Sequence, residues 1–69
     1  MYIISEIQTT GETTAVLTTT YKDKTSADSN FYSKCASAVL SKVPIHTVKM
    51  YNEMGVDIPE MTKTFIHNT

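Results

Sequence analysis

The single cysteine of this 69-residue chain, Cys35, most constrains what the chain can fold into. One cysteine cannot form an internal disulfide, and a chain of about 60–70 residues buries only about 60% of its unfolded surface. Chains this short usually need disulfides, a metal or self-association. The two histidines, His46 and His67, lack the spacing of a zinc site, which takes three or four His, Cys or carboxylate ligands. We therefore expect no metal and no cofactor, and we favour self-association.

Charge and hydropathy exclude several kinds of partner. The formal net charge is −1, and all six basic residues are lysine. Arginine is the usual residue for reading guanine and phosphate, so we expect no nucleic-acid partner. Apolar runs such as Ala38-Val39-Leu40 are far too short to span a bilayer, which takes about 20 apolar residues. The first residues also lack the basic and apolar regions of a signal peptide, so we expect no membrane partner and a cytoplasmic protein.

The hydropathy pattern predicts an α+β fold. Alternation of apolar and polar residues predicts four strands, over residues 2–9, 13–21, 45–51 and 61–67. An apolar stripe at helical spacing predicts one helix over residues 26–41, with Thr25 as its N-cap and Asp28 in its first turn. The expected architecture is ββαββ in one domain, residues 1–69: a four-stranded sheet with one helix packed on one face. Strand order stays open, and the helix could connect two parallel strands.

Large apolar side chains are expected on both faces of this sheet, although one helix covers only one face. Exposed apolar patches of more than a few hundred Å² usually mark an interface. Burying four side chains at roughly 2 kcal/mol each would contribute about 8 kcal/mol before entropy costs. The side chains assigned to this interface are Ile4, Val16, Val48 and Ile66. We therefore predict a homodimer or a higher oligomer, and the alternative is that twist and loops bury both faces of a monomer.

The candidate chemistry favours binding over catalysis. Cys35 lies in the apolar stripe of the helix and is expected to be inert core, and no pair of carboxylates stands out as an acid and a base. Tyrosine rings and polar groups provide stacking faces and hydrogen bonds for a nucleotide-like or sugar-like ligand at a subunit boundary. The candidate ligand-binding residues are Tyr2, Tyr21, His46, Lys49 and Tyr51. The alternative is that these are ordinary residues of a sheet.

Several short motifs resemble those of a group of small proteins from gut bacteria and their phages or prophages, a group with no established reaction. These motifs are Glu6-Ile7-Gln8-Thr9 before a glycine turn, Phe31-Tyr32 with residues 36–41, the segment 43–48, and Glu53-Met54-Gly55. The resemblance implies a phage-linked setting in the cytoplasm of a host cell, but it assigns no functional residue.

Three functions follow as expectations. The first is a non-enzymatic binding module, oligomeric through its open sheet face, that inhibits host defence by binding a host protein or sequestering a small ligand. The second is an accessory protein of the virion or capsid. The third is a small oligomeric enzyme with a site between subunits, for which His46 is the best single residue.

Overall fold

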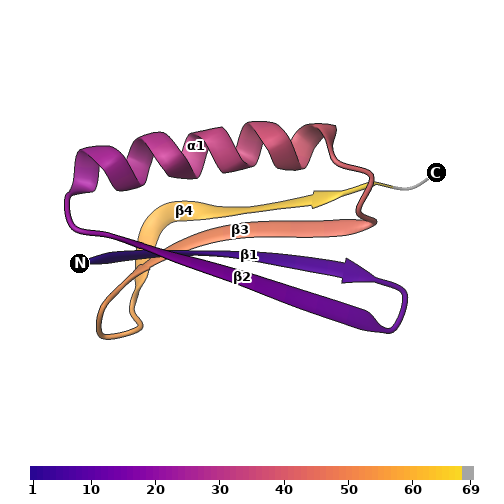
Figure 1. The fold of residues 1–69 in the computed structure, drawn as a ribbon, viewed down its shortest axis with the longest axis horizontal. Helices are drawn as coiled ribbons and strands as arrows, with labels where there is room; N and C mark the ends of the chain where they lie inside the picture. The colour runs from indigo at the N-terminus through magenta and orange to yellow at the C-terminus, as the bar shows by residue number, and fades with distance from the viewer. Residues whose placement is uncertain (68–69) are drawn as a thin grey trace.

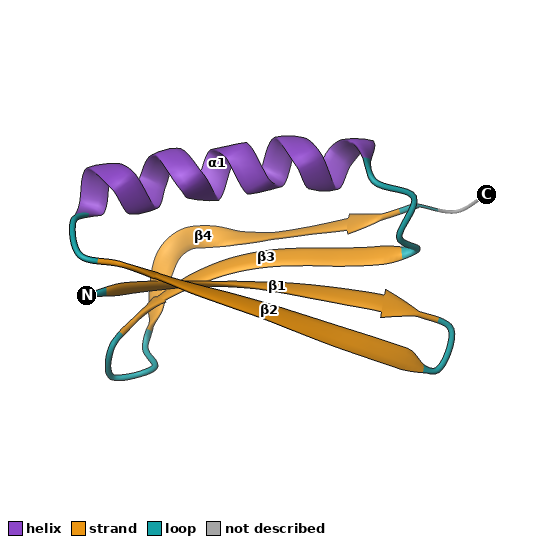
Figure 2. Ribbon diagram, viewed as in Figure 1, coloured by secondary structure: helices purple, strands orange, loops and turns teal. Residues whose placement is uncertain are grey.

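The computed structural model describes residues 1–67, and it confirms the α+β fold with the order ββαββ. One helix lies along one side of a four-stranded sheet (Figure 1), and no other helix or strand within residues 1–67 covers the opposite side (Figure 2). The elements are β1 (Tyr2–Thr10), β2 (Thr13–Tyr21), α1 (Lys24–Leu40), β3 (Ile45–Asn52) and β4 (Asp57–Ile66).

The strand order is β2-β1-β3-β4, and every neighbouring pair is antiparallel. Because β2 and β3 are both antiparallel to β1, they run parallel to each other. The connection through α1 is therefore a crossover between parallel strands, as the sequence suggested, and β1 lies between the two strands that it joins. This order places β2 and β4 at the two edges of the sheet.

The helix begins at Lys24, two residues before its predicted start. The N-cap is Asp23, whose carboxylate accepts a hydrogen bond from the backbone N–H of Ser26 at 3.1 Å. The prediction of Thr25 was wrong because Asp28 does not complete a capping box with it. Instead, Asp28 pairs with Lys24 at 2.7 Å, one helical turn away.

The last strand begins at Asp57, four residues before the predicted start. Its pairing with β3 is irregular between Lys49 and Tyr51, and Glu60 has a φ of 66°. This left-handed residue breaks the alternation along the strand, so that Ile58 and Met61 both pack against the core. Pro59 lies inside the strand rather than before it, and an edge strand tolerates the missing N–H.

The core lies between α1 and the three strands β1, β3 and β4. The helix contributes Phe31 at its centre, with an alanine on either side of it. The buried apolar residues are Ile4, Ala27, Phe31, Ala38, Val48, Met50 and Met61. Cys35 is half-buried against this core, and burial raises the pKa of its thiol, while the charge of Lys63 lowers it by less. The expectation that Cys35 packs with the core is confirmed.

Replacing Phe31 with alanine should remove most of the stability of this small domain. The Phe31 side chain is fully buried, so F31A should lower the free energy of unfolding by about 3–5 kcal/mol, a large part of the total available to such a chain. The matched control is Tyr32, the next residue, which is 60% exposed; Y32A should cost less than about 1 kcal/mol. Urea denaturation followed by circular dichroism measures both, and equal losses would contradict this core.

The stabilising effect of the Asp23 cap should depend on pH. The hydrogen bond from Ser26 lowers the pKa of the Asp23 carboxyl below its ordinary value. Because the folded pKa is below the unfolded one, the contribution is complete above the unfolded value, near 4, and is lost as the pH falls through the folded pKa. D23A should therefore lower the Tm by a few degrees at pH 7, and this difference should shrink at pH 3. D23N keeps an acceptor but no titration; equal pH dependence of wild type and D23N would refute the assignment.

Candidate functional site: the uncovered face of the sheet

The pairing of the strands defines which side chains lie on the face that α1 leaves uncovered, called here the open face. Ile4, Val48 and Met50 are fully buried toward the helix, so the alternate residues of each strand point the other way. The strand pairs extend this assignment across the sheet. The open face comprises Thr14, Val16, Thr18 and Thr20 of β2; Ile3, Ser5, Ile7 and Thr9 of β1; Ile45, Thr47, Lys49 and Tyr51 of β3; and Asp57, Thr62, Thr64 and Ile66 of β4.

Four aliphatic side chains cross the open face as a continuous diagonal stripe. Val16 is paired directly with Ile7, and Ile45 is paired directly with Ile66. Ile7 faces Thr47, which is two residues from Ile45, so Ile7 and Ile45 are diagonal neighbours within side-chain reach. Val16, Ile45 and Ile66 are 58%, 40% and 63% exposed. The diagonal stripe, defined as Val16, Ile7, Ile45 and Ile66, is thus apolar surface on all four strands.

The expected interface residues do not share one face. Val16 and Ile66 form the two ends of the diagonal stripe, but Ile4 and Val48 are fully buried beneath the helix. Their assignment to the uncovered face was wrong because alternation within a strand does not show which set of residues turns toward the helix. Ile7 and Ile45 take their places on β1 and β3.

A shallow hollow of about 290 Å³ lies beside the stripe, under the turn between β3 and β4. It is lined by Ser5, Ile7, Val16, Lys49, Tyr51, Gly55 and Asp57. Lys49 Nζ lies 3.1 Å from Asp57 Oδ1 and 5.8 Å from the centre of the Tyr51 ring. The Tyr51 hydroxyl is 2.9 Å from Ser5 Oγ. The hollow therefore combines two aliphatic side chains with an ion pair, whose charges cancel, and a hydrogen-bonded tyrosine.

The five predicted ligand-binding residues are divided between the two sides of the sheet. Lys49 and Tyr51 lie together in the hollow. His46 is buried toward the helix, and Tyr2 and Tyr21, paired across β1 and β2, pack partly buried against the core. The structure adds Ser5 and Asp57 to Lys49 and Tyr51. The sequence carried a signal for Ser5, which shares its strand face with Ile3 and Ile7, but none for Asp57, which was expected in a turn.

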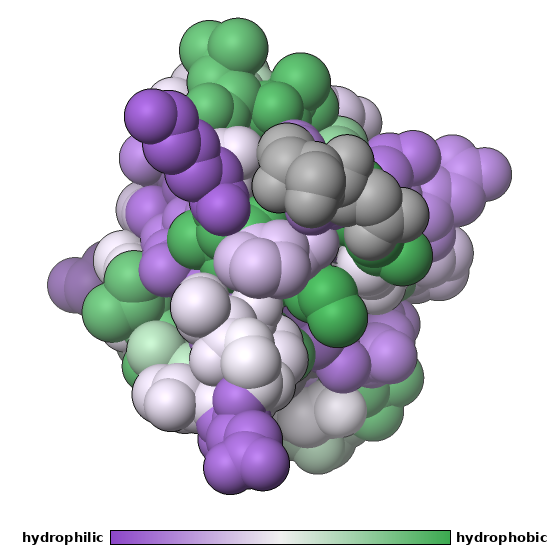
Figure 3. Space-filling model, turned by 90° about the vertical axis from the view of Figure 1, so that its right-hand side faces the viewer, coloured by the Kyte–Doolittle hydropathy of each residue, from purple (hydrophilic) through white to green (hydrophobic). Residues whose placement is uncertain are grey.

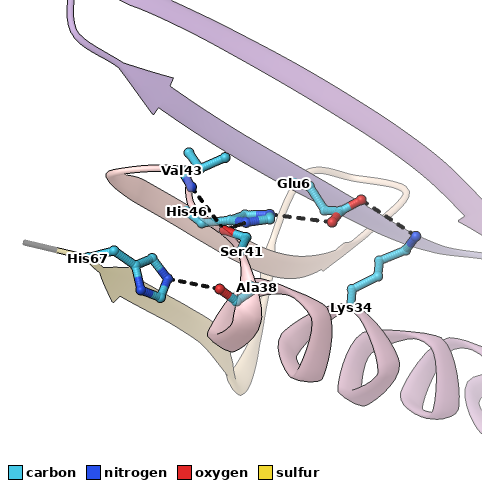
Figure 4. A network of polar contacts seen from close by, with 7 residues as sticks. All are labelled: Glu6, Lys34, Ala38, Ser41, Val43, His46 and His67. Atoms are coloured by element: carbon cyan, nitrogen blue, oxygen red, sulfur yellow. Dashed lines mark hydrogen bonds and ion pairs between the residues drawn. The ribbon is translucent and has the colours of Figure 1, made fainter. Parts of the chain in front are cut away.

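A second polar cluster ties the end of α1 to the sheet on the helix side (Figure 4). His46 Nδ1 lies 3.2 Å from Ser41 Oγ, and His46 Nε2 lies 3.4 Å from Glu6 Oε1. Lys34 on the helix reaches the other oxygen of Glu6 at 3.6 Å. Beside them, His67 Nε2 lies 2.9 Å from the carbonyl oxygen of Ala38. These contacts connect β1, β3 and the residues that follow β4 to the last turns of the helix.

This cluster contains serine, histidine and a carboxylate, the residue types of nucleophilic catalysis. Its surroundings indicate instead that the cluster stabilises the packing of the helix on the sheet. The His46 side chain is only 4% exposed, and Ser41 Oγ accepts a hydrogen bond from the backbone N–H of Val43 at 3.3 Å. The hollow lies on the opposite face of the sheet, away from this histidine. Residues 1–67 also contain no group of three or more His, Cys, Asp or Glu side chains placed to hold a metal ion.

Comparison with known proteins assigns neither a family nor a function to the chain. No protein-family model matches the chain, and neither a curated protein nor a solved structure is similar to it at a significant level. In the part of the chain that the structure describes, no helix has both the length and the apolar character needed to cross a membrane.

Removing the buried histidine should destabilise the fold and should leave any hydrolysis of p-nitrophenyl acetate unchanged. H46A should lower the free energy of unfolding by about 2–3 kcal/mol, because it leaves Ser41 and Glu6 without their buried partner. H67A, which removes one contact from a half-buried side chain, should cost less. Chemical denaturation measures both losses. A p-nitrophenyl acetate hydrolysis rate that H46A abolishes while the variant stays folded would instead identify a catalytic cluster.

Proposed function

We propose that this chain is a non-enzymatic binding module of a phage or prophage type that self-associates through its open face. The observation that carries the proposal is the diagonal stripe, which leaves apolar side chains exposed on the face opposite the single helix. Fully burying one such side chain contributes about 1.5–3 kcal/mol. Four on each copy are a large gain for a domain whose total stability is commonly 5–15 kcal/mol.

A second copy of the chain is the partner that this face favours. Two sheets pack face to face with their strands within about 30° of each other, and a two-fold axis brings the same surface of each copy together. The charged side chains of the open face, Lys49 and Asp57, neutralise each other, so two copies meet without net repulsion. The hollow shares Ile7 and Val16 with the stripe and would then lie at the boundary between subunits.

The proposed role is inhibition of host defence in the host cytoplasm, by binding a host protein or sequestering a small ligand. The hollow supports the ligand mode. Its volume of about 290 Å³ is near the lower end of small-molecule sites, which run to about 300–1,000 Å³. An aromatic ring, a hydroxyl pair and an ion pair surround it and provide stacking and polar contacts for a nucleotide-like molecule.

Placing a charge in the diagonal stripe should dissociate the face-to-face contact. Ile66 is 63% exposed, so I66K should fold normally while lowering the subunit number seen by native mass spectrometry and light scattering. Leu40, on the helix, is 84% exposed and is the matched control; L40K should leave the subunit number unchanged. The end of the helix also carries exposed apolar surface (Figure 3), to which Val39 and Leu40 contribute. L40K therefore tests directly whether this second patch forms the contact between copies.

Native mass spectrometry and co-sedimentation distinguish ligand sequestration from a role in the virion. An oligomer that retains a stoichiometric small mass, lost in a Tyr51→Ala variant, is the result expected for ligand sequestration. Co-sedimentation with phage particles would point to a virion accessory instead. A stable wild-type monomer at micromolar concentration would overturn the proposed association through the open face.

A further inference from the structure

The edge strand β2 lacks the features by which proteins prevent their sheet edges from pairing. It is nine residues long, has no charged residue, no proline and no bulge, and its residues 13–20 are all exposed. Figure 1 shows why: the hairpin of β1 and β2 diverges from α1 toward its turn, so the helix does not cover residues 13–20. A long, uncharged edge strand is a template for adding another strand.

The opposite edge of the same sheet is protected. β4 contains Pro59, the left-handed residue Glu60 and Lys63, and its register with β3 is shifted between Lys49 and Tyr51. Proline, a bulge and lysine are the devices that interrupt edge-to-edge pairing. The chain therefore blocks pairing at one edge of the sheet and leaves the other edge regular.

The register shows which backbone groups of β2 are free. The β1–β2 turn has two residues, and Gly11 has a φ of 59°, as the first position of a type II′ turn requires. Thr10 and Thr13, which close such a turn, form a hydrogen-bonded pair, and the pairs then alternate along the strands. The N–H and C=O groups of the even-numbered residues, Thr14, Val16, Thr18 and Thr20, therefore point away from β1.

Side-chain contacts support this alternation. Thr9 and Thr14 hydroxyls are 3.3 Å apart, and Ser5 and Thr18 hydroxyls are also 3.3 Å apart. Both contacts fall in pairs assigned as non-hydrogen-bonded, in which the side chains of an antiparallel ladder come closest.

We propose that β2 pairs antiparallel with β2 of a second copy, centred on Leu17, and joins the two sheets into one. A strand paired with itself about a two-fold axis satisfies this edge over its whole length, because Thr13 then faces Tyr21 and Thr14 faces Thr20. No charge opposes another in this register. Leu17, which is 54% exposed on the helix side of β2, is covered by its own symmetry mate.

Threonine pairs of the kind that this register creates already occur within the chain. Thr47 and Thr64 face each other across β3 and β4 with their hydroxyls 3.1 Å apart. Thr14 and Thr20 of the two copies would meet in hydrogen-bonded positions of the new ladder. This contact goes beyond the association proposed above, because it uses the edge of the sheet rather than the diagonal stripe. The two contacts can exist together or separately.

Disulfide trapping tests the register. In a C35S background, L17C should form an interchain disulfide, because residues directly opposite in a non-hydrogen-bonded pair have Cα atoms about 4.5 Å apart, within the 4.4–6.8 Å range of disulfides. The controls are L40C, at a leucine on the helix that is more exposed than Leu17, and V16C, which faces Thr18 of the other copy in this register. Rapid cross-linking of L17C, well above that of L40C, supports the proposal whether or not V16C also cross-links. Cross-linking of V16C without cross-linking of L17C, or equal yields of L17C and L40C, would overturn the proposed edge pairing.

Backbone substitution in an I66K background tests the edge with the face-to-face contact removed. T20P deletes an outward N–H while leaving the groups that bond β1 in place, so it should weaken dimerisation about tenfold or more without unfolding the chain. T20V keeps the N–H and should dimerise like its parent. Sedimentation equilibrium gives the dissociation constants, and circular dichroism confirms folding. A folded T20P variant that dimerises as tightly as T20V would refute β2–β2 pairing.

Discussion

One helix has to bury a four-stranded sheet, and it cannot cover all of it. The helix places Phe31 at the centre of the core, over the strands that contribute Ile4, Val48 and Met50. This packing satisfies one face of β1, β3 and β4, while β2 diverges toward its turn and the other face of the sheet is left without a partner. The two surfaces proposed for association, the diagonal stripe and the β2 edge, are both consequences of this incomplete cover.

The alternation of residues was sufficient to predict four strands, one helix and their order along the chain, but it did not show where the last strand begins. Glu60 adopts a positive φ and interrupts the alternation, so β4 could not be followed back to Asp57. The residues of the open face were harder to predict, because the adjacent isoleucines at positions 3 and 4 give no sign of which one faces the helix. Only the register between strands separates buried Ile4 and Val48 from exposed Val16 and Ile66.

Strand β3 connects the two polar clusters of the molecule. His46 points toward the helix and joins Glu6 and Ser41, while Lys49 and Tyr51 point to the other side and line the hollow. The ties beneath the helix hold β1 against β3, and Ser5 on β1 bonds Tyr51 across the same pair of strands. The hollow therefore lies over the two strands that these contacts hold together, and its polar side chains are already paired with one another.

The central position of β1 also governs how the sheet is assembled. The two hairpins are local, since each joins strands separated only by a short turn, whereas β1 meets β3 across the whole crossover, with Tyr2 paired to Asn52. Closing that long loop is the entropically expensive step, because it precedes the contacts that compensate for it. The pairing of β1 with β3 thus joins two hairpins that are each closed by a short turn, and the segment 22–44, which contains α1, is the part of the chain that connects them.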